Sequence, residues 1–437
     1  MQEHPHRRAL IDELHARPFA EIAAPCDVVF LACKHPQNAV GRDRAAERSL
    51  LADRLVAEGL DEKRLGNNHF RGPVGDGAKG DLLKWEQHSE FTSLALFRSA
   101  VAPEAFAFDD IRATLENWAE GLTAPVLVKV SLRVEHSPED PDAMGEQLER
   151  WFNAKSLAAA RILDGTAVLA GDFQLDAHGH MRFALFVPPS CSPARVGQLV
   201  QSVLEIETYR AMSMLGLDRA RKLAKALTDF DQRLEDIILA MAKADSDPES
   251  LLFDLLNISS TLEEQAALMT FRFGATEAYN AIVHDRIELL REQRFQGLQT
   301  FHEFMMRRFD PAIRTVSSTQ DRLNSQLNRT TRTAELLRTQ VDVSRSAQSQ
   351  TLLTSMDRRN AVQLRLQRTV EGLSVIAISY YAVNLLAGFL FPMAQVFDVT
   401  KAQVTAALVL PVVILVALMI RRVRLGEGKD GDGNGDE

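Results

Sequence analysis

Two stretches near the end of the chain, LSVIAISYYAVNLLAGFLF (373–391) and AQVTAALVLPVVILVALMI (402–420), contain no charged residue, and each is nineteen residues long. As an α-helix, each would span about 28 Å at roughly 1.5 Å per residue, which is close to the thickness of the bilayer hydrocarbon. A helix that is apolar on every side over this length is typical of a membrane span. We therefore expect two transmembrane segments, over residues 371–397 and 402–420.

Basic residues indicate how these segments are oriented. Arginines 358, 359, 365 and 368 precede the first span, and arginines 421, 422 and 424 follow the second. The connecting loop, PMAQVFDVTK, carries one acid and one base. Because basic flanks stay in the cytoplasm, the pattern predicts a two-pass protein of the cytoplasmic membrane with both termini inside. The first thirty residues lack a secretory signal, and the tail at 421–437, basic and then acidic, is expected to be disordered.

The first predicted span has one small and polar face. Ser374, Ala377, Tyr381, Asn384 and Gly388 recur at steps of three and four residues, which places them on one side of a helix. In hydrocarbon such a face requires either a protein partner or water. Two interpretations remain open: helix–helix packing, and a pore lining in which the Asn384 amide contacts an ion.

The segment 311–370 is predicted to be a single stalk helix. Its apolar residues keep a loose 3–4–7 spacing, while arginine, glutamine, serine and threonine fill most other positions. A helix this polar needs neighbouring helices, so we expect a coiled coil or bundle, formed either within one chain or between copies, and we expect a homo-oligomer. Twelve arginines, no lysines and five acids lie between positions 307 and 368. This excess of positive charge either faces anionic lipid headgroups or forms a solvated stalk.

The remainder of the chain is predicted to form a mixed α/β domain at 1–204 and a helical region at 205–310. Strands are expected at 27–35, 90–98, 125–134, 167–175 and 181–187, with DAHGH as the turn between the last two. Helices are expected near 40–59, 109–120, 143–160 and 192–204. The sequence DSDPE at 245–249 predicts a break between two amphipathic helices. A sheet covered by helices would account for this alternation.

Composition excludes several classes of protein. The net charge of −9 argues against a dedicated nucleic-acid binder. Three cysteines without zinc-like spacing, Cys26, Cys33 and Cys191, predict free buried thiols in a reducing compartment.

The chemical motifs in the chain are weak. GDGAKG at 75–80 matches G-x-G-x-x-G but does not follow an apolar strand, so we expect a loop there and no cofactor. His178 and His180 lie in the predicted turn, where exposed polar residues are expected. The acidic pair Glu263 and Glu264 suits a regulatory cation site or a solvated helix face equally well. Without a catalytic signature, the sequence does not predict an enzyme.

Several blocks resemble a bacterial family of membrane-anchored proteins, domain of unknown function 3422. These blocks are ELHARPF (13–19), LKWEQHSEFTS (83–93), EIETYRAM (205–212), FRFGATEAY (271–279) and MDRRNAVQLRLQRTVEGLSVIAISYYAV (356–383). The resemblance implies a bacterial inner-membrane location and no known activity. The polar or aromatic residues that it singles out are His15, Arg17, Trp85, His88 and Glu90.

The predicted layout is also similar to that of the CorA-type magnesium channels, although their Gly-Met-Asn signature is absent. Three hypotheses follow. The first is an oligomeric membrane-anchored protein whose cytoplasmic domain senses a ligand or an unknown protein partner. The second is a CorA-like channel or transporter for Mg²⁺ or another divalent cation. The third is an enzyme that uses His15, Arg17, His88 and Glu90, since a carboxylate near an imidazole suits acid–base chemistry.

Overall fold

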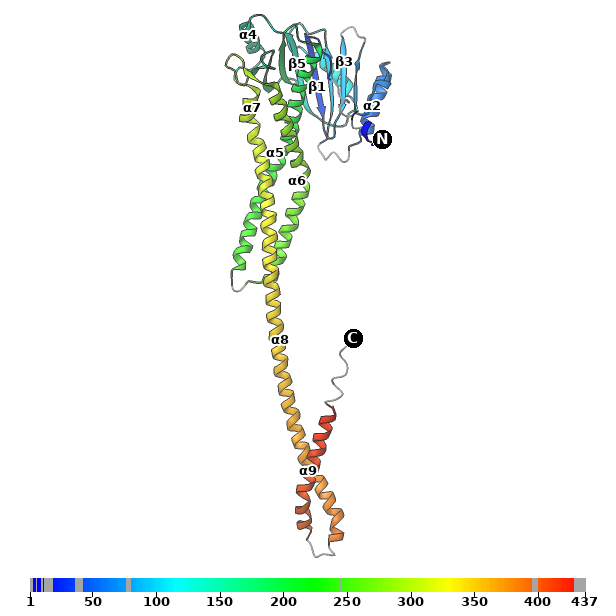
Figure 1. Ribbon diagram of the computed structural model, residues 1–437, viewed down its shortest axis with the longest axis vertical. Helices are drawn as coiled ribbons and strands as arrows, with labels where there is room; N and C mark the ends of the chain where they lie inside the picture. Colours follow the sequence, from blue (N-terminus) through cyan, green and yellow to red (C-terminus); the bar gives the residue numbers. More distant parts are fainter. Residues whose placement is uncertain are drawn as a thin grey trace. The chain divides into compact units, whose positions relative to one another are not determined.

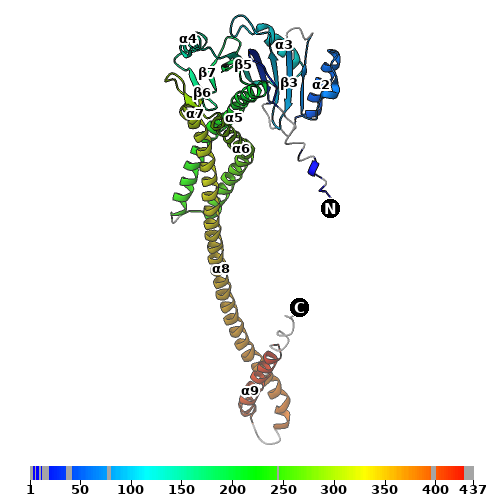
Figure 2. The same ribbon diagram turned by 45° about the horizontal axis from the view of Figure 1, so that its top comes forward.

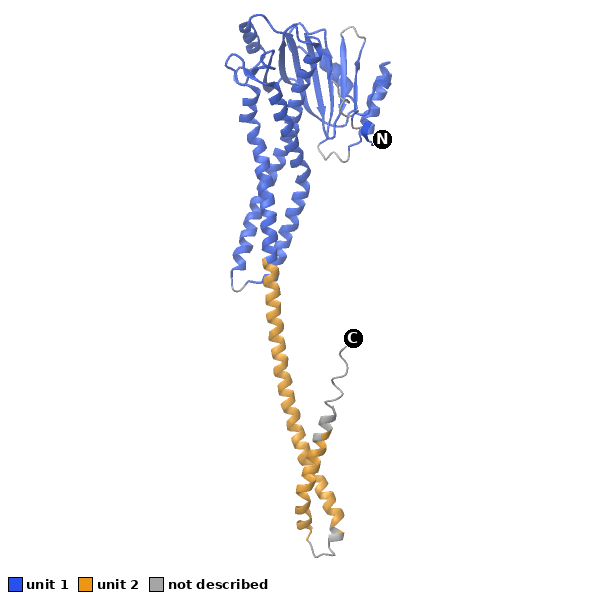
Figure 3. Cartoon of the chain, viewed as in Figure 1, with its two compact units in different colours: residues 1–335 blue, residues 336–437 orange. Residues whose placement is uncertain are grey.

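The computed structural model describes residues 3–4, 6–8, 11, 19–35, 42–75, 80–243, 246–394 and 400–427. Residues 1–335 form one compact unit and residues 336–437 form a second (Figure 3). The first unit contains a sheet and a helical bundle, and the second contains the end of a long helix and a further apolar helix.

Among the described residues, the first unit has a single nine-stranded sheet in the order β2-β3-β4-β1-β5-β8-β7-β6-β9 (Figure 1). The strands are β1 (Cys26–Cys33), β2 (His69–Pro73), β3 (Asp81–Gln87), β4 (Thr92–Arg98), β5 (Val126–His136), β6 (Ala158–Ile162), β7 (Ala167–Leu175), β8 (Met181–Val187) and β9 (Gln293–Arg294). Neighbouring strands are antiparallel except for β5 and β8, which are parallel. The sheet is therefore mixed.

Helices cover both faces of this sheet. Besides the first part of a long helix that continues into the second unit, the described helices of the first unit are α2 (Arg44–Ala57), the short 3₁₀ helix η2 (Glu62–Arg64), α3 (Asp109–Ala119), α4 (Pro141–Trp151), α5 (Pro193–Met241), α6 (Pro248–Leu290) and α7 (Phe301–Arg308). Alternate residues of the central strand β1 enter two different cores. Val28 and Phe30 pack with residues of α5 and α6, whereas Val29 and Leu31 pack with α2 and α3. Burial on both faces explains why β1 is an unbroken apolar run.

The sequence prediction is confirmed for the five apolar strands, which correspond to β1, β4, β5, β7 and β8. It is wrong for residues 158–160, which were expected in a helix and instead belong to β6. The β6 sequence AAARI has little intrinsic strand preference, so its pairing with β7 decides its conformation. The edge strand β9 comes from beyond α6, outside the 1–204 region that was assigned to the α/β domain.

Helices α5 and α6 form an antiparallel pair, and the first part of α8 (Asp310–Ala394) packs beside them. Figures 1 and 2 show the three helices side by side. The predicted break at 245–249 is confirmed, because α5 ends at Met241 and Asp247 caps the start of α6. Arg322 of α8 donates to Asp231 of α5 at 2.7 Å, and Gln326 Nε2 donates to the Leu227 carbonyl at 2.7 Å. These polar contacts hold α8 against α5 up to the end of the first unit.

In the second unit, the end of α8 packs against α9 (Lys401–Glu427). Val383 and Ala387 of α8 are buried there, as are Val412 and Val416 of α9. By length and composition, both helices contain stretches that are long and apolar enough to cross a membrane. The prediction of two apolar helices at the end of the chain is confirmed to that extent.

Candidate functional site

The α5-facing side of the sheet contains a cavity of about 310 Å³. Lys84, Glu86 and His88 of strand β3 and its hairpin are spaced two residues apart, so they point to the same face of the sheet. Ser93, Ala95 and Phe97 of β4 continue this floor, while α5 forms the opposite wall. A second hollow, of about 810 Å³, shares Phe19, Glu205 and Arg286 with the cavity.

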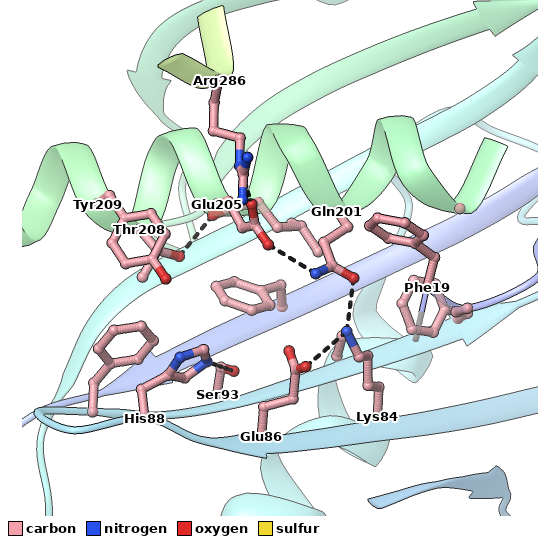
Figure 4. A pocket seen from close by; sticks show the side chains of 17 residues that line it. Phe19, Lys84, Glu86, His88, Ser93, Gln201, Glu205, Thr208, Tyr209 and Arg286 are labelled. Atoms are coloured by element: carbon pink, nitrogen blue, oxygen red, sulfur yellow. Dashed lines mark hydrogen bonds and ion pairs between the residues drawn. The ribbon is translucent and has the colours of Figure 1, made fainter. Parts of the chain in front are cut away.

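A continuous chain of polar contacts crosses the cavity (Figure 4). Lys84 Nζ lies 3.0 Å from Glu86 Oε1 and donates to Gln201 Oε1 at 2.8 Å. Gln201 Nε2 donates to Glu205 Oε1 at 2.8 Å, and Arg286 Nε donates to Glu205 Oε2 at 2.5 Å. The chain therefore links the sheet to α5 and then α5 to α6.

The other walls of the cavity are aromatic or apolar. The His88 ring stacks on Phe91, with 4.1 Å between the ring centroids, and its Nε2 lies 3.5 Å from Ser93 Oγ. Phe91 in turn meets Tyr209 edge to face. The cavity thus has a polar side and an aromatic side, as is typical of small-molecule sites.

A buried ion cluster lies next to the cavity, centred on Glu90 in the β3–β4 hairpin. The Glu90 carboxylate accepts a hydrogen bond from Arg272 of α6, lies 3.5 Å from Lys34 Nζ, and accepts from the Tyr279 hydroxyl at 2.9 Å. Burial raises the pKa of Tyr279, and the Glu90 charge raises it further. Burial also lowers the pKa of Lys34, and the Arg272 charge adds to this effect. Tyr279 stacks on the cavity residue Tyr209, so the cluster and the cavity are in contact.

The segment that begins at Phe19 crosses the start of α5. Ile22 N donates to the Pro193 carbonyl at 3.0 Å, and Arg71 donates to the Phe19 carbonyl at 2.6 Å. Gly197 allows the close approach, because a Cβ at this position would lie 1.6 Å from the Ala20 carbonyl oxygen. The glycine therefore positions Phe19 at the edge of the cavity.

The sequence-predicted residues are divided by the fold. His88 lines the cavity, Glu90 lies in the adjacent cluster, and Trp85 is buried on the opposite face of the sheet in the core with α2 and α3. His15 and Arg17 lie outside the described residues. Since Glu90 is fully occupied by cationic and hydroxyl partners, its role in the structure is to join the sheet to α6.

The sequence patterns did not predict the polar chain itself. Lys84, Glu86 and Glu205 all lie within the blocks that carry the family resemblance, but neither Gln201 nor Arg286 does. The two-residue alternation of Lys84, Glu86 and His88 was a signal that could have placed these three side chains on one face.

The expectation that both turn histidines are exposed is wrong for His180. The DAHGH hairpin is confirmed, and His178 is exposed, but His180 is only 1% exposed. Its Nδ1 lies 3.1 Å from Ser131 Oγ, beneath Arg112 and Asp176, which pair at 2.6 Å. Burial, with a contribution from Arg112, lowers the pKa of His180 to about 4.

We expect this histidine to make the first unit sensitive to acid. An unfolded imidazole takes up a proton near pH 6.5, whereas the folded one does so only near pH 4. Stability should therefore fall by about 3 kcal/mol in total as the pH decreases from 6.5 to 4, at about 1.36 kcal/mol per pKa unit. Urea unfolding of His180→Asn across this range should show a flatter pH dependence. His178→Asn is the control, and an equally flat profile for it would contradict the prediction.

The other sequence-predicted groups do not assemble into a cation site. Glu263 and Glu264 are exposed on α6. Within the described part of the chain, no group of three or more His, Cys, Asp or Glu side chains is placed to hold a metal ion. Gly75 and Gly80 flank an undescribed segment between the antiparallel strands β2 and β3, so a strand follows where a dinucleotide fingerprint requires a helix. All three cysteines are free.

The stripe on α8 lies outside the buried apolar contact with α9, although Asn384 borders a hollow that Thr405 and Val409 of α9 also line. Tyr381 and Asn384 are exposed, and Asn384 Nδ2 donates to the Tyr380 carbonyl of its own helix at 3.0 Å. Ser374 is half-buried and Gly388 is exposed. The stripe's assignment to helix packing or to a pore therefore stays a prediction.

The fold and the site define a class of protein with a ligand-sized cavity between a mixed sheet and a helical bundle, followed by two apolar helices. The chain matches the family model described as "Protein of unknown function (DUF3422)" over residues 2–426, and it belongs to that family. Neither the curated proteins nor the solved structures include a match to the chain, so the similarity to CorA-type channels gains no support.

Proposed function

We propose that this protein is a membrane-anchored, oligomeric receptor whose N-terminal unit binds a small ligand in the cavity. The observation that carries the proposal is the polar chain from Lys84 to Arg286, which crosses a cavity of about 310 Å³. Its end residues lie on the sheet and on α6, so a molecule bound there contacts both. Since α5 and α6 also pack together beyond the cavity, ligand binding would change the packing of these two helices in the bundle.

The ligand site can be tested by filling the cavity. Ala95 lies on the cavity floor and is 4% exposed, so Ala95→Phe should occupy the space that a ligand needs. In a thermal-shift screen of metabolites with the full-length protein in nanodiscs, we expect a ligand to raise the melting temperature of the wild type but not of the variant. Ser93→Leu provides a second blocking variant if Ala95→Phe does not fold. A ligand shift that survives both changes would refute the cavity as the site.

The proposed anchor consists of the apolar C-terminal part of α8 and the apolar stretch of α9 that ends at Ile420. Arginines on the flanks of both apolar stretches support a topology with both termini in the cytoplasm. Self-association of the α8 stalk is supported by its exposure, because residues 342–370 are all exposed, including Leu352, Leu353 and Met356. A lone helix of this kind gains little from packing, whereas copies wound together would bury these side chains.

Two variants would test the anchor and the oligomer together, each with one added cysteine in a Cys191→Ser background that retains the buried Cys26 and Cys33. Thr400→Cys lies in the predicted outer loop and should react with a membrane-impermeant maleimide in intact cells. Position 349 lies on the exposed stalk, so the cysteine of Ser349→Cys should react with the same maleimide only after the cells are permeabilised. A bismaleimide should then cross-link this cysteine to its counterpart in a second copy of the chain. Labelling of both positions in intact cells would contradict the topology. Absence of any cross-linked product would contradict stalk self-association.

A further inference from the structure

We propose that the cavity binds a small zwitterion with an apolar side chain, of which an aromatic amino acid is the simplest example. This inference rests on the proposal that the cavity is a ligand site, and it adds the chemical class of the ligand. Three properties of the cavity support it: its charge balance, a buried carboxylate oxygen that has an ion-pair partner but no aligned hydrogen-bond donor, and its aromatic walls.

Acidic and basic groups are balanced inside the cavity. Lys84 pairs with Glu86 at 3.0 Å, and Arg286 pairs with Glu205 at 2.5 Å. The first pair is well shielded from water, with side chains only 9% and 12% exposed. An anion or cation bound alone would compete for one member of a pair and leave the other without a counter-charge, which is costly at a buried site. A ligand with one ammonium and one carboxylate adds both charges and keeps the balance.

The polar chain has hydrogen-bonding capacity left for such a ligand. Glu86 Oε1 is buried, and although Lys84 Nζ is close, no group in the described part of the chain donates a well-aligned hydrogen bond to it. A ligand ammonium would supply that donor, which removes the cost of an unsatisfied buried acceptor. Arg286 uses its Nε for Glu205, and its guanidinium has further N–H groups suited to a carboxylate.

The aromatic walls define the rest of the ligand. Phe91, Phe97, Leu204 and Tyr209 also line the cavity. They would bury an apolar side chain, and a ring could stack among them. A volume of about 310 Å³ is at the lower end for small-molecule sites, which range from roughly 300 to 1,000 Å³. It is large enough for a single amino acid.

Calorimetry with three matched probes tests the ligand class on the full-length protein in nanodiscs. The probes are L-phenylalanine, 2-phenylethylamine, which lacks the carboxylate, and 3-phenylpropanoate, which lacks the ammonium. We expect L-phenylalanine to bind at least tenfold more tightly than either analogue. Glu86→Gln and Lys84→Met should each weaken its binding about tenfold or more, which corresponds to about 1.4 kcal/mol.

The ion pair of Lys129 and Glu116, 3.5 Å apart and outside the cavity, provides the controls. Lys129→Met and Glu116→Gln should leave the binding of L-phenylalanine unchanged. Equal binding of an analogue with a single charge would overturn the inference. If L-phenylalanine does not bind but a molecule of another class does, and Ala95→Phe abolishes that binding, the ligand class is wrong and the receptor proposal stands. If L-phenylalanine binds equally well to Ala95→Phe and Ser93→Leu, the cavity is not the site and both proposals fail.

Discussion

Replacing Glu90 by alanine is expected to destabilise the first unit by about 3–5 kcal/mol, the usual cost of removing one partner from a buried ion pair. The side chains of Glu90, Arg272 and Lys34 are 3%, 2% and 5% exposed. Without the carboxylate, Arg272 would remain charged and buried, because a guanidinium does not lose its proton in a protein. Lys34 can become neutral, so Arg272 accounts for most of the expected loss.

Urea unfolding followed by tryptophan fluorescence would measure this loss. The three tryptophans, Trp85, Trp118 and Trp151, all lie in the first unit, so the signal reports on that unit alone. The double variant Glu90→Leu/Arg272→Met should recover much of the stability, since an apolar pair needs no counter-charge. Glu116→Ala removes a largely exposed ion pair and should cost less than about 1 kcal/mol. A Glu90→Ala loss as small as that of Glu116→Ala would disprove the proposed role of the cluster.

Gly197→Ala is expected to destabilise the first unit by about 3 kcal/mol, at the upper end for overpacking. The added methyl group would meet backbone atoms of Ala20, at 1.6 Å from the carbonyl oxygen and 2.8 Å from the carbonyl carbon. Backbone atoms cannot relieve the clash by changing rotamer as a long side chain can. The segment from Phe19 to Ile22 would therefore have to move away from α5. Because Phe19 lines the cavity, ligand binding should weaken as well.

Gly274→Ala is the matched control for this change. Gly274 also lies within a long helix, but a Cβ there would meet no heavy atom within 4 Å. Alanine has the higher helix propensity, so this variant should be neutral or more stable by up to about 1 kcal/mol. Similar losses in the two variants would show that the contact with Ala20 is not the cause. Fluorescence-detected urea unfolding again provides the measurement.

Local patterns in the sequence were sufficient for the apolar elements. The strands β1, β4, β5, β7 and β8 are apolar runs or alternations bounded by turns, and the break before α6 has a capping acid and a proline. Each of these signals depends on neighbouring residues only. The edge strand β9 and its neighbour β6 gave no such signal, because pairing with adjacent strands determines their conformation more than their own residues do.

The site was only partly predictable. His88 and Glu90 were identified, but they were grouped as possible acid–base partners, whereas the fold assigns one to the cavity and the other to the ion cluster. Their side chains are two residues apart in a tight hairpin, where the alternation of a regular strand no longer holds. His180 was misjudged for a related reason, since a turn residue is buried when a helix such as α3 covers it.

The sequence by itself determined the two apolar helices, the long helices before them and the strands of the sheet's centre, because hydrophobic periodicity is a property of consecutive residues. Only the tertiary structure decided the cavity. Lys84 and Gln201 are 117 positions apart, and Arg286 and Glu205 are 81 apart. These side chains meet because α5 and α6 pack across one face of the sheet. Which distant residues come together depends on the packing of whole elements, and no local pattern contains that information.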